Sequence, residues 1–402
     1  MLKLEASWMG DVDDPSYHLG ALATLEEADL ALGRVAERVT EEPHTIDAVT
    51  REWIHAVIGK SVPGAALISL TAGRGHDGMT ERRKWRLEWN AEGRAADLPQ
   101  RIFVKATPAD VYHRETLAVM HMGYTEVNFY EQIQPSISGI TPKGYYGRAY
   151  PGGRYILLLE DLEVRGLQPF WMGDYCSPAH AKAVAAAMAE YHALYWESSR
   201  FYQDLSWIRP KSRRYGRFWH AAGLHEDRIK FLDTELASDL SEDLRDFVHR
   251  YNDNVFDLHR YYDTLPPTLL HGDSHLGNSF ATPDGRAGMF DWQLVFRGPA
   301  YRDLAYFVYS ALTIEDRQAH ETSIFDHYMD ALQDRGVTPD RGQAWRDYCL
   351  LLLERWDGVF KTPLHGYFGH DPKAYQRQAR SIHSALVEHD VNGLMRHALA
   401  KI

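Results

Sequence analysis

Apolar residues change their spacing along the chain, and the change separates a first part that contains strands from a second part that is mostly helical. In the first part, helical spacing predicts helices over residues 19–40 and 46–59, with Thr45 as the N-cap of the second. A further helix is expected over residues 111–134. Short apolar or alternating runs predict strands over 66–70, 84–90, 101–106, 144–149 and 154–160.

The second part shows helical spacing with one interruption. Helices are predicted over about 178–197, 239–262, 300–312, 316–334, 341–360 and 373–388. The interruption, residues 268–293, has short apolar runs between loops rich in Gly, Asp, His and Asn. We therefore expect an α+β protein with two lobes, a sheet-bearing lobe over residues 1–162 and a helical lobe over residues 163–402.

Composition and charge narrow the functional classes. The chain is 45% hydrophobic and 25% charged, and its net charge of −12 argues against a nucleic-acid binder. Cys176 and Cys349 are the only cysteines, which argues against a disulfide framework or a cysteine-based zinc site. The N-terminus lacks the features of a signal peptide, and no apolar run is long enough to span a membrane. The sequence thus predicts a soluble, cytoplasmic protein.

Residues 268–293 contain the candidate catalytic and metal-binding residues. They include Leu-His271-Gly-Asp273-Ser-His-Leu-Gly-Asn278, followed by Asp291. Asp273 is a candidate to accept the proton of an acceptor hydroxyl, and Asn278 and Asp291 offer the hard oxygen ligands that Mg²⁺ prefers. Their order and spacing match the catalytic loop and metal aspartate of kinases. The structural alternative is an Asx-rich turn that joins two strands.

The first lobe holds candidate phosphate-binding groups. Gly73, Gly75 and Gly78 form a GxGxxG pattern, but a strand rather than a helix follows it, which favours a hairpin over phosphates instead of a dinucleotide site. Lys105 lies within a predicted strand, where a buried ammonium requires an acidic partner. The alternative is a solvated lysine on an edge strand.

These motifs together resemble one superfamily. His271-Gly-Asp273-x4-Asn278 with Asp291-Trp-Gln resembles the aminoglycoside phosphotransferases, choline kinases and ecdysteroid-kinase-like proteins. The segment Gly298-Pro-Ala-Tyr-Arg-Asp303-Leu-Ala resembles the next segment of that superfamily. The resemblance covers roughly residues 60–312 and implies a protein-kinase-like fold that uses ATP and Mg²⁺. It also implies that Asp303 braces the catalytic loop, often through His271.

Two details resemble the ecdysteroid-kinase-like branch. Glu126-Val-Asn-Phe-Tyr matches its Glu-x-x-Phe-Tyr pattern, which favours Glu126 over Glu115 and Glu131 as the partner of Lys105. Lys105 is then expected to contact the α- and β-phosphates of ATP. Leu-Leu-Leu-Glu160-Asp-Leu162 resembles the inter-lobe hinge, where backbone groups near Glu160 and Leu162 would bind adenine.

The expected activity is phosphorylation of a hydroxyl group on a small molecule, because no Ala-Pro-Glu segment typical of protein kinases follows Asp291-Trp-Gln. The branch resemblance favours an apolar alcohol; an aminoglycoside or macrolide antibiotic is the alternative acceptor. Tryptophans that could line such a pocket are Trp171, Trp196, Trp207 and Trp219. Two other classes stay open: a non-catalytic pseudokinase, and a metallohydrolase that would use His271, Asp273, His275 and Asp291.

Overall fold

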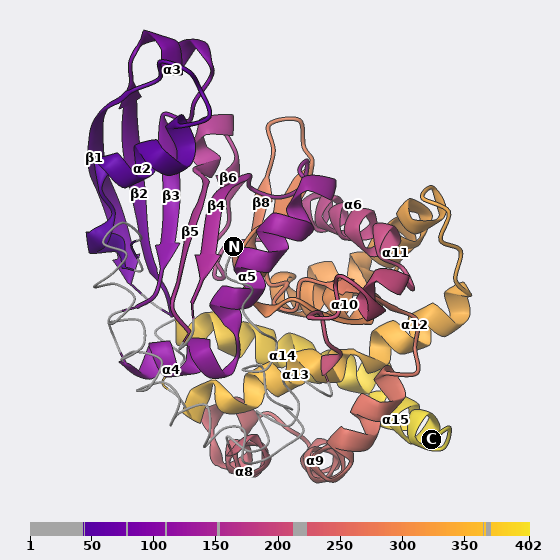
Figure 1. Ribbon diagram of the computed structural model, residues 1–402. Helices are drawn as coiled ribbons and strands as arrows, with labels where there is room; N and C mark the ends of the chain where they lie inside the picture. Colours follow the sequence, from indigo (N-terminus) through magenta and orange to yellow (C-terminus); the bar gives the residue numbers. More distant parts are fainter. Residues whose placement is uncertain are drawn as a thin grey trace. The chain divides into compact units, whose positions relative to one another are not determined.

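The computed structural model contains two compact units, which are Met1–Leu167 with Asp291–Leu294, and Gln168–Phe290 with Val295–Ile402 (Figure 1). It describes residue 43 and residues 45–77, 79–108, 111–150, 153–211, 223–364, 366 and 371–402. The predicted helix over 19–40 lies outside the described residues, as do Gly78 and Trp219. An antiparallel sheet in the first unit and a mainly helical second unit confirm the predicted α+β fold with a protein-kinase-like division into lobes.

The first unit is built on a five-stranded antiparallel sheet in the order β1-β2-β3-β5-β4. Its strands are β1 Leu67–Asp77, β2 Glu81–Trp89, β3 Arg101–Ala106, β4 Gly144–Ala149 and β5 Tyr155–Glu160. The interior strands β3 and β5 are the most apolar runs of the lobe, and Ile102, Val104 and Leu158 are fully buried. Lys105 therefore lies on an interior strand rather than on the edge of the sheet.

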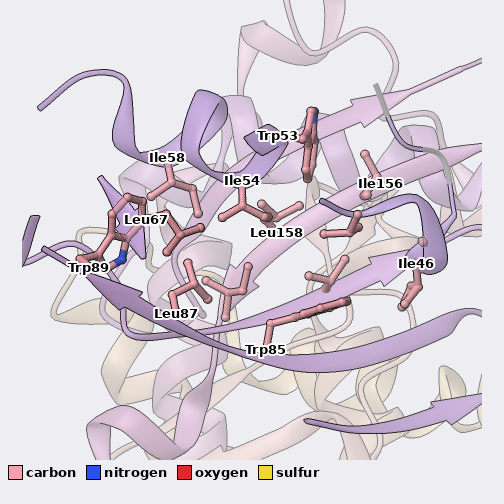
Figure 2. Packing of buried hydrophobic residues seen from close by; sticks show 14 residues of the cluster. Ile46, Trp53, Ile54, Ile58, Leu67, Trp85, Leu87, Trp89, Ile156 and Leu158 are labelled. Atoms are coloured by element: carbon pink, nitrogen blue, oxygen red, sulfur yellow. The ribbon is translucent and has the colours of Figure 1, made fainter. Parts of the chain in front are cut away.

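Short helical segments cover one face of this sheet. They are η2 Ile46–Ala48, α2 Arg51–Ile54 and the π-helix η3 His55–Gly59. Figure 2 shows Ile54 and Ile58 packed toward Leu87 and Leu158 of the strands. The single helix predicted over 46–59 with a Thr45 cap is wrong. The Thr50 hydroxyl accepts the Trp53 amide at 3.2 Å, so the α-helix starts at Arg51.

Two further expectations for the first unit are corrected. The predicted helix over 111–134 is divided into α4 Val111–Val119 and α5 Met122–Gln132, because His121 adopts a left-handed backbone with φ +52°. Gly73 and Gly75 lie within β1, which is longer than expected, and not in the turn after it. The remaining helices of the unit are α3 Ala91–Ala95, η4 Gln134–Ser136, η5 Leu162–Arg165 and η12 Trp292–Leu294.

The second unit is mainly helical. Its α-helices are α6 Pro178–Leu194, α8 His225–Lys230, α9 Glu242–Tyr262, α10 Tyr301–Ala311, α11 Ile314–Gln333, α12 Arg341–Leu350, α13 Leu352–Lys361, α14 Pro372–Glu388 and α15 Val391–Leu399. Its short helices are η6 Ser199–Tyr202, η9 Phe231–Asp233, η10 Glu235–Ala237 and η11 Leu276–Asn278. The helix predicted over 341–360 is thus two helices, and α8 and α15 were not predicted.

Two small sheets in the second unit frame the interruption found in the sequence. One has the order β6-β8-β9, formed by Gln168–Pro169, Ser279–Ala281 and Ala287–Met289. The other pairs β7 Pro267–Leu270 with β10 Phe296–Pro299. The catalytic-loop motif therefore begins directly after β7 and ends directly before β8. Among the described helices, none is both long and apolar enough to cross a membrane.

Candidate active site

The first unit brings together three charged side chains that are far apart in the sequence. The buried Lys105 ammonium lies 2.7 Å from the Glu126 carboxylate and 2.9 Å from Asp291 Oδ1. The predicted pair of Lys105 and Glu126 is thus present. Glu131, an alternative partner, has an exposed side chain. We name Lys105, Glu126 and Asp291 the lysine cluster.

The electrostatics of the lysine cluster follow from its burial. Burial raises the pKa of Glu126 to about 7, although the Lys105 ammonium opposes this effect. Burial alone would lower the pKa of Lys105, but Asp291 and Glu126 outweigh it and hold that pKa above its ordinary value. When all three groups are ionised, two carboxylates face one ammonium. This surplus of negative charge, on hard oxygen donors, suits a divalent cation.

A pair of stacked aromatic rings holds the lysine cluster together. Trp292, which follows Asp291, is fully buried and stacks on Phe129 with ring centroids 4.2 Å apart and an interplanar angle of 9°. Phe129 lies three residues after Glu126 on α5, so the two side chains lie on the same face of the helix. The Glu-x-x-Phe and Asp-Trp motifs therefore form one contact set within the first unit.

Of the other predicted nucleotide-binding residues, Gly73, Gly75 and Glu160 lie on strands of the same sheet, and Leu162 begins η5. A Cβ at Gly73 would lie 3.0 Å from the Lys84 carbonyl oxygen, and one at Gly75 would lie 3.2 Å from that of Arg82, so both glycines permit a close approach of β1 and β2. In the hinge segment, the Glu160 amide donates to the Lys143 carbonyl at 2.8 Å, and the Leu162 carbonyl accepts from Leu167 at 3.2 Å. The adenine contacts expected near Glu160 and Leu162 stay a prediction from the sequence.

In the second unit, Asp303 braces the candidate catalytic loop through the backbone. Its carboxylate accepts hydrogen bonds from the amides of His271 at 2.6 Å and Gly272 at 3.2 Å, and its carbonyl accepts the Ser274 hydroxyl at 2.9 Å. Gly272 has φ +85°, a conformation that favours glycine. Because the carboxylate binds two consecutive amides, it fixes the start of the loop.

Other charges in the second unit keep Asp303 ionised. Burial alone would raise its pKa, but the nearby His192 ring, whose Nε2 lies 3.6 Å from Oδ2, and the charge of Arg302 outweigh burial, and the pKa lies well below its ordinary value. The His271 ring contacts both the candidate catalytic loop and the residue before Asp291. Its Nε2 lies 2.9 Å from the Phe290 carbonyl oxygen, and its Nδ1 accepts the Asp273 amide at 3.2 Å.

Asp273 lies at the partly exposed tip of this loop. Tyr306 donates its hydroxyl to Asp273 Oδ1 at 3.2 Å, and His275 Nε2 lies 3.5 Å from Oδ2. Burial alone would raise the pKa of Asp273, but His275, His271 and Arg302 together hold it below its ordinary value. From the sequence, Tyr306 had no assigned part in catalysis, and His275 had one only in the metallohydrolase alternative. The available signals were the place of His275 inside the motif and the i+3 spacing of Tyr306 from Asp303 on a predicted helix.

Asn278 is oriented for metal binding. Its side-chain nitrogen donates to the Asp273 carbonyl at 2.9 Å, so its side-chain oxygen is the atom that could bind a cation. The amide of Phe290, the residue before Asp291, donates to the Asn278 carbonyl at 2.9 Å. The side-chain oxygens of Asn278 in the second unit and of Asp291 in the first unit are each of the hard type that Mg²⁺ prefers. Within the described ranges, no group of three or more His, Cys, Asp or Glu side chains is arranged to hold a metal ion.

Comparisons with known proteins found one matching family model and several solved structures of low sequence identity. Residues 83–336 match the ecdysteroid kinase-like family. Similar solved structures include an ethanolamine kinase from Plasmodium vivax, which is 14% identical with a TM-score of 0.45 over 80% of this chain and 83% of that one. A choline kinase from Cryptosporidium parvum is 10% identical, with a TM-score of 0.49 over 87% and 98%. A macrolide 2′-phosphotransferase from Brachybacterium faecium is 14% identical, with a TM-score of 0.45 over 82% and 98%. No curated protein matches the sequence.

Proposed function

Because this chain belongs to the ecdysteroid kinase-like family, whose match covers residues 83–336, we propose that it transfers the γ-phosphoryl group of ATP to a hydroxyl group of a small molecule. The observation that carries the proposal is the lysine cluster. A buried ammonium between two carboxylates, one of them also a candidate metal ligand, is the arrangement that kinases require at their phosphates.

The first unit supplies the groups that would bind the triphosphate of ATP, and Asn278 of the second unit is proposed as a further ligand of Mg²⁺. Lys105 donates to the α- and β-phosphates, and Glu126 holds its ammonium in place. The glycine-bearing end of β1 lies over the phosphates. Asp291 and Asn278 would hold Mg²⁺, which supplies neutralisation of the charge on the β- and γ-phosphates.

The second unit supplies the group that would act on the acceptor. Asp273 accepts a hydrogen bond from the acceptor hydroxyl and receives its proton as the new O–P bond forms and the bond to ADP breaks. A carboxylate with a lowered pKa is a weak base. Asp273 therefore acts mainly by orienting the hydroxyl, and proton transfer comes late in the step, as expected for a loose phosphoryl-transfer transition state.

The acceptor that we propose is an apolar alcohol, with an aminoglycoside or macrolide as the alternative. Trp171 supports the first option, because 74% of its surface is exposed and its chain neighbour Met172 lies against the catalytic loop. The Met172 amide nitrogen is 3.0 Å from where a Cβ at Gly277 would lie. Trp207, in contrast, is a buried core residue.

The proposal is tested with Asp273→Asn in an assay of ATP-dependent phosphate incorporation into a panel of hydroxylated compounds. Turnover should fall by at least ~10²-fold while ATP binding is retained, because the proton acceptor is lost but the lysine cluster is intact. Asp284→Asn is the matched control, since Asp284 lies in an exposed turn of the same unit, and it should leave turnover unchanged. Near-normal turnover of Asp273→Asn would refute the role of Asp273.

The same preparation separates the other classes. A pseudokinase would neither hydrolyse nor transfer the phosphate of ATP. A metallohydrolase would carry tightly bound zinc or iron, which elemental analysis of the purified protein would detect.

A further inference from the structure

Tyr306 on α10 contacts the candidate catalytic carboxylate through its hydroxyl. The Tyr306 oxygen lies 3.2 Å from Asp273 Oδ1, and the side chain comes from the turn of α10 that follows Asp303. Burial raises the pKa of the Tyr306 hydroxyl above its ordinary value. The hydroxyl therefore keeps its proton and is the donor in this hydrogen bond.

The two oxygens of Asp273 are held unequally. Oδ1 accepts the Tyr306 hydroxyl at 3.2 Å, whereas the contacts of Oδ2 with described residues are longer, 3.4 Å to the side-chain nitrogen of Asn278 and 3.5 Å to His275 Nε2. Contacts of that length are weak hydrogen bonds. Tyr306 therefore holds one oxygen of the carboxylate and leaves the other available to an acceptor hydroxyl.

Two arginines restrict the Tyr306 ring. The guanidinium carbon of Arg302 lies 4.4 Å from the ring centroid, and that of Arg355 lies 4.8 Å from it. Both distances are within the range of cation–π attraction. Arg302 Nη1 is held by Asp303 at 3.2 Å, and Arg355 donates to the Gln378 side chain on α14. The ring is thus fixed by groups that are fixed themselves.

A glycine in α13 provides the space for this arrangement. A Cβ at Gly358 would collide with Arg355 Nη1 and would lie 3.8 Å from the Tyr306 hydroxyl oxygen. Glycine weakens the interior of a helix, so its presence at this point of α13 requires a local reason. The space that Arg355 occupies beside Tyr306 supplies that reason. The segment over residues 313–402, which lies outside the resemblance found in the sequence, therefore contributes to the surroundings of Asp273.

We propose that Tyr306 is a positioning residue that fixes the rotation of the Asp273 carboxylate, so that Oδ2 is the oxygen that receives the proton of the acceptor. Arg302 and Arg355 in turn fix the Tyr306 ring. The inference rests on the proposed function of Asp273 and adds the residue that orients it.

The first test is Tyr306→Phe, which removes only the hydroxyl. Its kcat should be about tenfold lower, the cost of one hydrogen bond to a charged group, while KM for ATP is unchanged. Tyr309→Phe is the matched control, because it removes a hydroxyl from the same helix where the ring stacks on Tyr348, and its kcat should stay at the wild-type value. Arg355→Gln should lower kcat by a smaller factor.

A double mutant separates positioning from a structural role. In an Asp273→Ala background, Tyr306→Phe should cause no further loss of kcat, because Tyr306 would act only through the carboxylate. An additional tenfold loss in that background, or a kcat of Tyr306→Phe equal to that of the wild type, would overturn the inference.

A crystal structure of Tyr306→Phe gives a readout that does not depend on activity. We expect the Asp273 carboxylate to rotate away from its wild-type orientation, and an unchanged orientation would overturn the inference. If the wild type phosphorylates no acceptor at all, the proposed function fails, and the orientation of Asp273 in the two crystal structures still decides whether Tyr306 positions it.

Discussion

The lysine cluster and the Asp273 loop hold their carboxylates in different ways. In the lysine cluster, Glu126 and Asp291 are held by the charge of Lys105, and the three residues are separated by up to 186 positions. In the Asp273 loop, hydrogen bonds from backbone amides hold Asp303, and the Tyr306 hydroxyl holds Asp273. In the lysine cluster an opposite charge holds the carboxylates, whereas mainly neutral hydrogen-bond donors hold Asp303 and Asp273.

This difference predicts which property of the protein a substitution in each region lowers first. Removing one member of a buried ion pair leaves an uncompensated charge, which strongly destabilises a fold. Removing a neutral donor from a partly exposed carboxylate costs less stability but misplaces the reacting group. Substitutions in the lysine cluster should therefore appear first in stability and ATP binding, and those in the Asp273 loop first in turnover.

Lys105→Met should produce the largest change in stability. Glu126 would stay fully buried without its ammonium, at a cost of about 3–5 kcal/mol in the free energy of unfolding near pH 8. The double variant Lys105→Met/Glu126→Leu is the control and should recover most of this loss, because no buried charge remains. Urea denaturation of both proteins measures the difference. Equal stability of the single and double variants would show that the charge of Lys105 does not stabilise Glu126.

The second prediction is that pH acts in opposite directions on the two units. Burial raises the pKa of Glu126 to about 7, above the ordinary value of 4.5. Between pH 4.5 and pH 7, the folded first unit therefore binds more protons than the unfolded chain. Its stability should fall as the pH rises through this range. In the second unit, burial lowers the pKa of His180 and of His383 from 6.5 to about 4. The unfolded chain then binds more protons, and stability rises with pH from 4 to 6.5.

Each of these groups contributes at most about 3 kcal/mol to the pH dependence. Hydrogen exchange, measured at pH 5 and pH 7 and corrected for the intrinsic rates, should show weaker protection at pH 7 in β3 and α5 and stronger protection in α6 and α14. Glu126→Gln should abolish the change in the first unit, and His180→Gln should reduce the change in the second. Protection that changes in the same direction in both units would contradict the comparison.

The smallest expected effect concerns the aromatic stack beside the lysine cluster. Trp292→Phe keeps a ring against Phe129 and should cost about 1 kcal/mol of stability, while the Mg²⁺ concentration needed for half-maximal turnover rises because Asp291 is held less firmly. Trp356→Phe is the matched control, since Trp356 is equally buried but lies in the second unit, stacked on Tyr251. It should lower stability without changing the Mg²⁺ requirement.

The local pattern of apolar and polar residues was enough to predict much of the fold. The interior strands β3 and β5 were predicted because strands buried on both faces are continuously apolar, and the long helices α6, α9 and α11 because their apolar residues recur at helical spacing. The failures lie where one residue changes the backbone without changing the pattern. His121 divides a helix by taking a positive φ, and Thr50 rather than Thr45 caps α2.

Part of the candidate site was likewise predictable from the sequence, and part was not. Asp273, Asn278 and Asp291 were found because their chemistry requires those residue types in that order, and Lys105 because a cation on an apolar strand demands a carboxylate. The spacing of the motifs could not show that Trp292 stacks on Phe129, or that Asp291–Leu294 belong to the first unit while the residues on either side belong to the second.

The sequence by itself determined which atoms this protein can use: a proton acceptor, oxygen ligands for a cation, and a lysine with a carboxylate partner. Only the tertiary structure decided how those atoms are held. The contact of Arg355 with the Tyr306 ring, and the glycine in α13 that leaves room for it, join segments separated by about 50 residues. Such contacts leave no periodic signal in the chain, because each residue involved also fits an ordinary helix.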